Sequence, residues 1–241
     1  MIEIKKIYIH PLYTYPNLYN DIAILELGRR IEYGFDKFGD TPTCMDKPGQ
    51  DNVDKIATVR GYGLTENATT PDKILEANVT VLSNEQCKEF FKFNQTDKPA
   101  IKRQIETALP FGLNYGFLCA QGTVNKKGAF RGSCKGDSGG PLTTFKEDKE
   151  TLIGIVSGGI GCALGIPGWY TKVSFYYPWI DCIIQTVKES KGNVNIVNEK
   201  CDKVAADLVP SCLEEDDLIF GSDFDLRSEN NFQIDRCSKD K

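Results

Sequence analysis

Short apolar runs alternate with turn residues along most of the chain, which is the pattern of an antiparallel β protein. Near the N-terminus Ile2, Ile4, Ile7 and Ile9 predict a strand, which His10-Pro11 ends. Residues 21–27 form a second apolar run, whose β-branched side chains predict a buried strand. Residues 42–56 are rich in Pro, Gly and Asp, and we interpret them as a crossing segment. From residue 56 to residue 177 the alternation predicts an antiparallel barrel.

Two stretches depart from this β pattern and predict helices. Ser83 followed by Asn-Glu-Gln86 is a capping box, and it predicts a short helix that runs to residue 91. Residues 177–188 carry Ile180, Ile183, Ile184 and Val187 at helical spacing and predict an amphipathic helix. We interpret the polar residues 94–107 as a surface insertion. The polar and acidic residues 193–241 suggest a loosely ordered, disulfide-stapled tail, with a docking segment for a partner or pro-region as the alternative.

The composition excludes several functional classes. A net charge of -5 offers no basic face for nucleic acid. No apolar run approaches the ~20 residues that span a bilayer, so we expect no membrane partner. Nine cysteines indicate an oxidising compartment, whereas the lack of zinc-type spacing and the single histidine predict no metal and no other cofactor.

Sequons at Asn67, Asn78 and Asn94 would be glycosylated in a secretory route, so we expect a secreted protein. Residues 1–6 lack the apolar region of a signal peptide. Together these observations predict that the chain lacks its front end.

The most informative stretch is Gly136-Asp137-Ser138-Gly139-Gly140-Pro141. A nucleophilic serine needs a proton acceptor and an anion site beside it, and glycines let successive backbone N–H groups turn toward one point. The same residues are all turn formers, so from these residues alone a plain turn remains an equal alternative.

Further motifs surround this stretch in a fixed order, and together they resemble the trypsin/chymotrypsin-like serine proteases over most of the chain. The blocks are Ile9-His10-Pro11, Asn20-Asp21-Ile22-Ala23-Ile24-Leu25, Gly61-Tyr62-Gly63, Phe117-Leu118-Cys119-Ala120, the Ser138 motif, Gly154-Ile155-Val156-Ser157-Gly158-Gly159, Pro167-Gly168-Trp169-Tyr170-Thr171-Lys172-Val173 and Tyr177-Pro178-Trp179-Ile180.

The resemblance implies an all-β fold, a trypsin-like double antiparallel β-barrel with a C-terminal helix. Residues 1–41 would be a remnant of the N-terminal barrel, 42–190 the C-terminal barrel with its closing helix, and 191–241 a cysteine-containing tail. The family's earlier strands have no counterpart in the chain, so we expect the first barrel to be incomplete, open at its edges and poorly folded by itself.

The resemblance also implies the roles of individual residues. Ser138 would be the nucleophile, Asp21 the triad acid, and the N–H groups of Gly136 and Ser138 the oxyanion hole. Asp137 would pair with an amine freed by activation cleavage, and it would stay unpaired in this chain. His10 matches a common non-catalytic His-Pro, and the family's Ala-Ala-His-Cys block is absent. Losing the triad histidine costs on the order of 10⁶ in turnover, so this chain should be inert alone.

The substrate-binding residues implied by the resemblance are Gly132, Ser157, Gly158, Gly159 and Gly168. Gly132 at the floor offers no charge to Lys or Arg, so an open pocket predicts cleavage after large apolar residues. Plain turn glycines are the alternative. Gly158 stands where the family usually has Trp, so one cleft wall lacks its aromatic surface.

Implied disulfides are Cys87–Cys119 and Cys134–Cys162, and Cys44 would link to a missing pro-segment. The pairing of Cys182, Cys201, Cys212 and Cys237 stays open. We therefore predict a serine endopeptidase, made as a zymogen, that acts on protein or peptide substrates. The alternative is a non-catalytic homologue with a binding or regulatory role.

Overall fold

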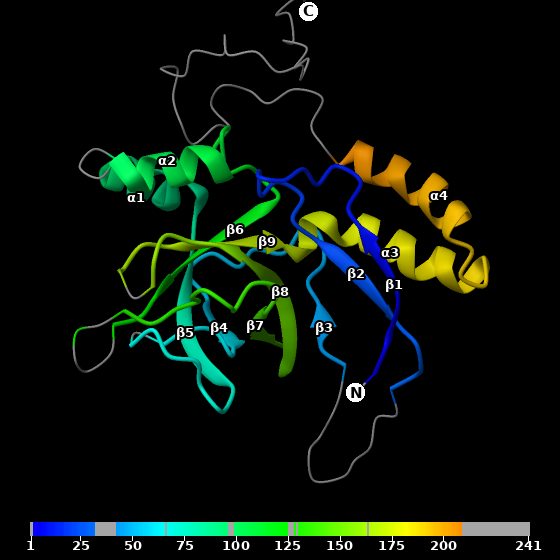
Figure 1. Ribbon diagram of the computed structural model, residues 1–241, viewed down its shortest axis with the longest axis horizontal. Coiled ribbons are helices and arrows are strands. Elements are labelled where there is room, and N and C mark those ends of the chain that lie inside the picture. The colour runs from blue at the N-terminus through cyan, green and yellow to red at the C-terminus, as the bar shows by residue number, and fades with distance from the viewer. Residues whose placement is uncertain are drawn as a thin grey trace, which may run out of the picture.

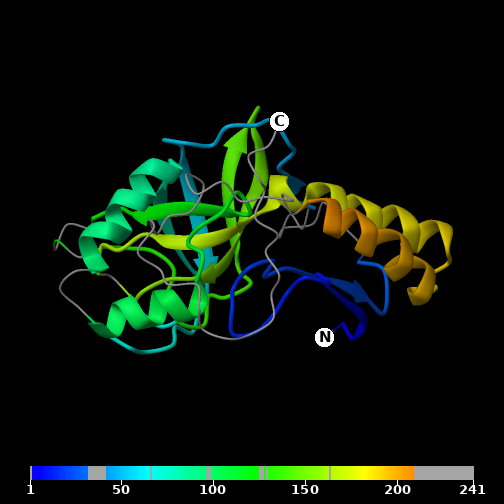
Figure 2. The same cartoon turned by 90° about the horizontal axis from the view of Figure 1, so that it is seen from above.

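The computed structural model describes residues 2–31, 42–65, 67–95, 99–124, 128, 130–162 and 164–208. Residues 209–241 lie outside this part, and with them Cys212, Cys237 and most of the expected tail. In both views the barrel lies between two helical pairs, with α1 and α2 at one end and α3 and α4 at the other (Figures 1 and 2).

Within the described residues, six antiparallel strands close into a barrel (Figure 1). Their order around it is β4-β5-β6-β9-β8-β7, and Thr58 opposite Thr143 joins β7 back to β4. Alternate side chains such as Val59, Val79 and Leu142 fill the interior. The expected C-terminal barrel is confirmed. Its strands are β4 Ile56–Gly61, β5 Leu75–Leu82, β6 Phe117–Gly122, β7 Pro141–Lys146, β8 Lys149–Gly158 and β9 Gly168–Lys172.

The N-terminal strands form a separate antiparallel sheet, in which β1 Ile4–Ile9 pairs with β2 Ala23–Leu27. One face of this sheet packs on α3, whereas Ile7 and Leu25 on the other face are 57% and 50% exposed. The expectation that residues 21–27 form a buried strand was therefore wrong. Successive side chains point to opposite faces, so a sheet that is covered on one side buries only every second residue.

The crossing segment contributes β3 Cys44–Met45, which pairs in parallel with β8. Just after it, the fully buried Asp46 carboxylate accepts hydrogen bonds from Lys146 at 2.5 Å and from Asn52 at 2.8 Å. These bonds anchor the segment to β7.

Helices α1 Asn84–Gln95 and α2 Pro99–Ala108 lie between β5 and β6. The capping box is present, since Ser83 and Gln86 exchange backbone-to-side-chain hydrogen bonds of 2.7 and 3.2 Å. The helix nevertheless extends beyond residue 91. The surface insertion expected at 94–107 is largely α2, most of whose described residues are exposed, although it buries Ile105.

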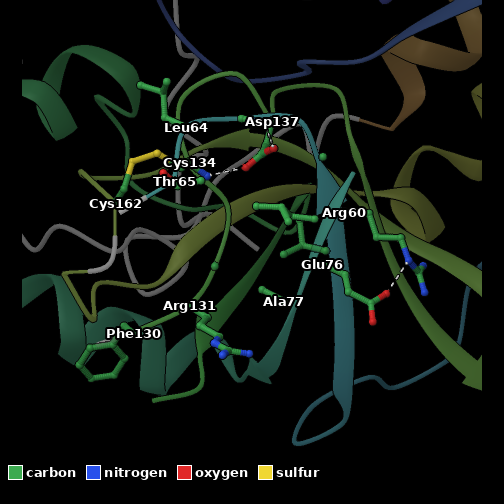
Figure 3. A pocket seen from close by; sticks show the side chains of 15 residues that line it. Arg60, Leu64, Thr65, Glu76, Ala77, Phe130, Arg131, Cys134, Asp137 and Cys162 are labelled. Atoms are coloured by element: carbon green, nitrogen blue, oxygen red, sulfur yellow. Dashed lines mark hydrogen bonds and ion pairs between the residues drawn. A yellow bond between two sulfur atoms is a disulfide. The ribbon is translucent and has the colours of Figure 1, made fainter. Parts of the chain in front are cut away.

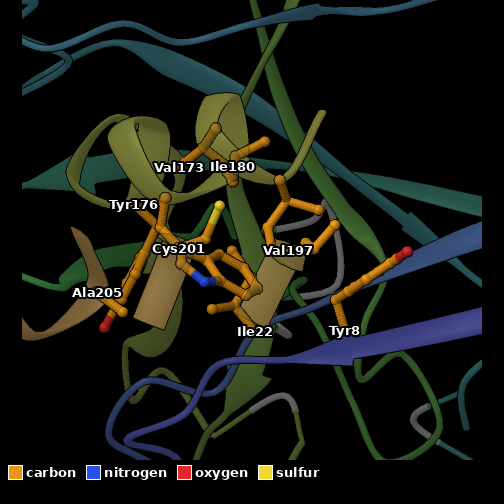
Figure 4. Close-up of a cluster of buried hydrophobic side chains, with 10 residues drawn as sticks. Tyr8, Ile22, Val173, Tyr176, Ile180, Val197, Cys201 and Ala205 are labelled. Carbon is orange, nitrogen blue, oxygen red and sulfur yellow. The ribbon is translucent and has the colours of Figure 1, made fainter. Parts of the chain in front are cut away.

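The chain ends its described part with α3 Val173–Glu189 and α4 Val194–Asp207, which pack side by side (Figures 1 and 2). Helix α3 begins four residues before the expected helix, with Pro178 in its second turn. Helix α4 lies where a loosely ordered tail was expected. It forms because Val197, Cys201 and Ala205 face α3 at helical spacing (Figure 4). The Cys182–Cys201 disulfide also joins the two helices.

Each of the two tryptophans lies in a different apolar cluster. Trp179 belongs to the cluster that joins β1, α3 and α4, together with Tyr8 and Ile22 (Figure 4). Trp169 belongs to the cluster that joins α1 and α2 to β6 and β9. Both side chains are 1% exposed. Among the helices of the described residues, none has the length and apolar character that a membrane-spanning helix needs.

Candidate active site

Ser138 lies in a tight turn that leads into β7, and its side chain is exposed. Gly136 and Gly139 flank it with φ angles of 101° and 81°, which a residue with a side chain rarely adopts. The Gly139 N–H binds the Val156 carbonyl on β8 at 2.8 Å. Within the described part of the chain, the N–H groups of Gly136 and Ser138 have no acceptor. They are free to bind an external oxygen.

Asp21 lies two residues before the start of β2 and is hydrogen-bonded to two barrel strands. Its Oδ2 accepts the Ser157 hydroxyl of β8 at 2.8 Å, and its carbonyl accepts the Thr171 hydroxyl of β9 at 2.7 Å. Burial raises the pKa of this carboxyl, and the bond from Ser157 opposes the rise. The sequence assigned Ser157 to substrate binding, and Thr171 was not singled out although it lies in a matched block.

Asp21 and Ser138 line the same open hollow, of about 520 Å³, although 117 positions of sequence separate them. Val156 of β8 and Tyr13 also line this hollow. Its remaining wall is the exposed apolar face of the N-terminal sheet, with Ile7 and Leu25. The hollow thus joins an acid and a serine but contains no histidine, since His10 is not among its lining residues.

His10 lies instead in the cluster beneath α3, where it is 1% exposed. Its ring packs against Tyr176 and Trp179 at centroid distances of 5.3 and 5.0 Å, and its Nδ1 accepts the Leu12 N–H at 3.3 Å. Burial lowers the pKa of His10 to about 4. The side chain is a neutral core residue.

The Asp137 side chain lines a second cavity, of about 330 Å³, and Ser138 is not among the lining residues of this cavity (Figure 3). The expectation that no freed amine pairs with this carboxylate stays a prediction, but two backbone amides bind it. Its Oδ1 accepts the Gly63 N–H and its Oδ2 accepts the Cys134 N–H, both at 2.8 Å. Backbone amides therefore supply the partners that the sequence did not identify.

The proposed substrate-binding glycines fall into two groups. Gly158, Gly159 and Gly168 adjoin one another at the ends of β8 and β9, and Gly168 lies beside the Ser133 and Tyr170 hydroxyls. A Cβ built at Gly158 would lie 2.3 Å from the Trp169 indole nitrogen, so Trp169 occupies the space of any side chain there. Gly132 lines the Asp137 cavity and a smaller one beside Tyr170, and it does not line the hollow at Ser138.

The structure contains both disulfides that the resemblance implied, Cys87–Cys119 and Cys134–Cys162, and it adds Cys182–Cys201. Cys44 is exposed and unbonded among the described residues. Of the sequons, Asn67 and Asn78 are exposed, and the side chain of Asn94 lies outside the description. Within the described residues, no cluster of side chains could hold a metal ion.

Comparisons with known proteins relate the sequence of this chain to serine proteases. The profile of the family described as Trypsin matches residues 1–180. The chain is 33% identical over 187 residues to the serine protease filzig of Drosophila melanogaster, which covers 75% of the chain. It is 29% identical over 191 residues, or 79% of the chain, to the CLIP domain-containing serine protease C9 of Anopheles gambiae. It is 30% identical over 181 residues, or 74% of the chain, to Trypsin-1 of Astacus astacus. The matches span 10%, 51% and 66% of those proteins' own lengths.

Proposed function

Because the chain belongs to the trypsin family of serine proteases, we propose that Ser138 is the nucleophile of a secreted endopeptidase and Asp21 its triad acid. The observation that carries this proposal is their meeting at one hollow, with Asp21 held by Ser157. The Ser138 hydroxyl attacks the peptide carbonyl, a base takes its proton and passes it to the leaving amine, and water then hydrolyses the acyl-enzyme. Asp21 holds the base in the required tautomer.

The oxyanion hole is formed by the N–H groups of Gly136 and Ser138. Their lack of acceptors among the described residues supports this role, because each can donate to the oxygen that becomes negative in the tetrahedral intermediate. Removing one such donor typically lowers turnover by about 10²–10³. The proposed reaction requires no metal or organic cofactor.

The base comes from polypeptide outside these 241 residues. The chain has a single histidine, and His10 is packed under α3 rather than at the hollow. The exposed apolar wall of the hollow, with Ile7, Ile9 and Leu25, supports docking of further apolar strands that would bring the base to Asp21. The 241-residue chain is inactive without them.

The substrates are proteins or peptides, cleaved after large apolar residues. Support comes from Gly132 itself, which carries no carboxylate to pair with a basic side chain and where an added Cβ would meet no atom within 4 Å. The exposed sequons and the disulfides support secretion as a glycoprotein zymogen, and the exposed Cys44 is available for a bond to a pro-segment.

A fluorophosphonate probe tests the catalytic part of the proposal. The 241-residue chain should show no labelling of Ser138, because the hydroxyl has no base. After activation cleavage, a longer chain that includes the residues encoded upstream of Met1 should be labelled and should cleave a peptide library after large apolar residues. Ser138→Ala should abolish labelling, and Asp21→Asn should lower turnover by about 10⁴. Preference for Lys or Arg would refute the pocket assignment.

A non-catalytic homologue is the second candidate, and the position of His10 outside the hollow favours it. The same probe separates the two functions. A longer chain that folds, has undergone activation cleavage and still leaves Ser138 unlabelled would support a binding or regulatory role and exclude the endopeptidase.

A further inference from the structure

Gly61 and Gly63 lie on either side of the Asp137 carboxylate, and neither has a φ angle that requires glycine. Gly61 ends β4, where it pairs with Leu75 in ordinary extended backbone. A Cβ built on Gly61 would lie 2.0 Å from the Asp137 Oδ1, and one built on Gly63 would lie 2.5 Å from its Cγ. What glycine provides at both positions is space for this carboxylate.

The carboxylate also holds the two segments together. The Gly63 N–H and the Cys134 N–H each donate to it at 2.8 Å. One side chain therefore joins the end of β4 to residues 134–140 around Ser138, which we call the serine turn. Hydrogen bonds donated to charged acceptors are stronger than those between neutral groups. Gly63 is itself buried, which shields its bond from water.

Backbone contacts extend this junction to Ser138. The Asp137 N–H binds the Cys134 carbonyl at 3.0 Å, and the Gly140 N–H binds the Asp137 carbonyl at 2.8 Å. A Cβ built on Gly136 would lie 3.1 Å from the Gly63 Cα, so the turn and the β4 segment are in direct contact. The position of the Gly136 and Ser138 amides therefore depends on the position of the Asp137 carboxylate between Gly63 and Cys134.

We propose that Gly61 and Gly63 are positioning residues. They leave room for the Asp137 carboxylate, so that the backbone amides of Gly63 and Cys134 bind it and fix the serine turn. This inference rests on the proposed function for its significance, since the held turn carries the nucleophile and the oxyanion donors. This seating of the carboxylate is a property of the 241-residue chain and can be measured without activity.

Amide hydrogen exchange on the full chain, resolved by NMR, tests this seating. Gly61→Ala forces the carboxylate from its place, so protection of the Gly63 and Cys134 amides should fall by at least about tenfold. In an Asp137→Ala background the clash is gone, and Gly61→Ala should cause no further loss in the turn. Gly132→Ala is the matched control, because its added methyl group meets no atom within 4 Å and its exchange pattern should be unchanged.

Asp137→Asn serves as a second variant that keeps the volume of the side chain. A carboxamide can accept only through its oxygen, so one of the two amides should keep its protection and the other should lose it. Equal effects of Gly61→Ala in both backgrounds, or unchanged protection in Asp137→Asn, would overturn the proposal. Either result would leave the endopeptidase proposal intact, whereas failure of the probe test would leave the seating intact.

Discussion

Burial of His10 predicts that the folded chain loses stability as the pH falls from 6.5 toward 4. The imidazole is 1% exposed and packs between Tyr176 and Trp179. Its Nδ1 already accepts the Leu12 N–H, so a proton added there would break that bond and place a charge among aromatic rings. Folding therefore favours the neutral form.

The magnitude follows from the difference between the two states. The pKa is 6.5 in the unfolded chain and about 4 in the folded one, a difference worth about 3 kcal/mol. Above pH 6.5 both states are neutral and the contribution is complete. Between pH 6.5 and 4 only the unfolded chain takes up the proton, so the free energy of unfolding falls. Below pH 4 both states are protonated and this loss stops. Since typical domains are stable by only about 5–15 kcal/mol, the effect is large.

Urea unfolding followed by circular dichroism at several pH values measures this loss. Other groups titrate in the same range, and Asp21 acts in the opposite direction because burial raises its pKa. The comparison is therefore between the chain and His10→Phe, which keeps an aromatic ring but has no proton to bind. The chain should lose about 3 kcal/mol more than the variant between pH 7 and pH 4.

NMR gives an independent measurement, because His10 is the single histidine and its ring resonances need no assignment. They should stay unchanged down to about pH 5. A midpoint near 6.5 in the folded chain, or parallel stability profiles for the chain and His10→Phe, would refute the argument from burial.

Three further predictions concern packing and covalent constraint. Gly158→Ala should destabilise the chain by about 1–3 kcal/mol, because the added methyl group meets the Trp169 indole. Gly159→Ala should cost less, because its added Cβ lies 3.7 Å from the nearest atom, and equal melting temperatures of the two variants would contradict this prediction. Cys201→Ala opens a loop of 19 residues and should cost about 3 kcal/mol, with loss of exchange protection in α4 but not in the barrel. Backbone amides of β2 should exchange with solvent faster than those of β6, because β2 pairs with a strand on one side only. Equal protection of the two strands would show that the N-terminal sheet is stable without further strands.

The sequence predicted the barrel well because its evidence there is local. Alternation along β4 and β5 marks the inward side chains, and turn residues separate the strands. It failed for α2 and α4, whose helical stripes are short and set in polar surroundings. Ile105 and Cys201 are buried only because α1 and α3 lie beside them, and such tertiary contacts have no local signal.

The site shows the same division between local and long-range information. The motif around Ser138 and the residues around Asp21 identified both side chains, and the structure brings them to one hollow. The partners of Asp137 could not be predicted, because hydrogen bonds from Gly63 and Cys134 depend on how β4 meets the serine turn. Gly61-Tyr62-Gly63 was visible as a motif, but its spacing alone did not indicate that two glycines make room for a carboxylate.

The placement of the two tryptophans in two different apolar clusters gives the chain a pair of built-in optical reporters. Trp179→Phe would leave emission from Trp169 alone, so its spectrum would follow the cluster between the barrel and the α1–α2 pair. Trp169→Phe would leave Trp179, which reports on the packing of β1, α3 and α4. The Trp179 ring lies 5.0 Å from His10, and a protonated imidazole quenches a neighbouring indole by accepting an electron from its excited state. Dimming of the Trp179 signal on acidification, while Trp169 keeps its intensity, would therefore report the protonation of His10 in the folded chain.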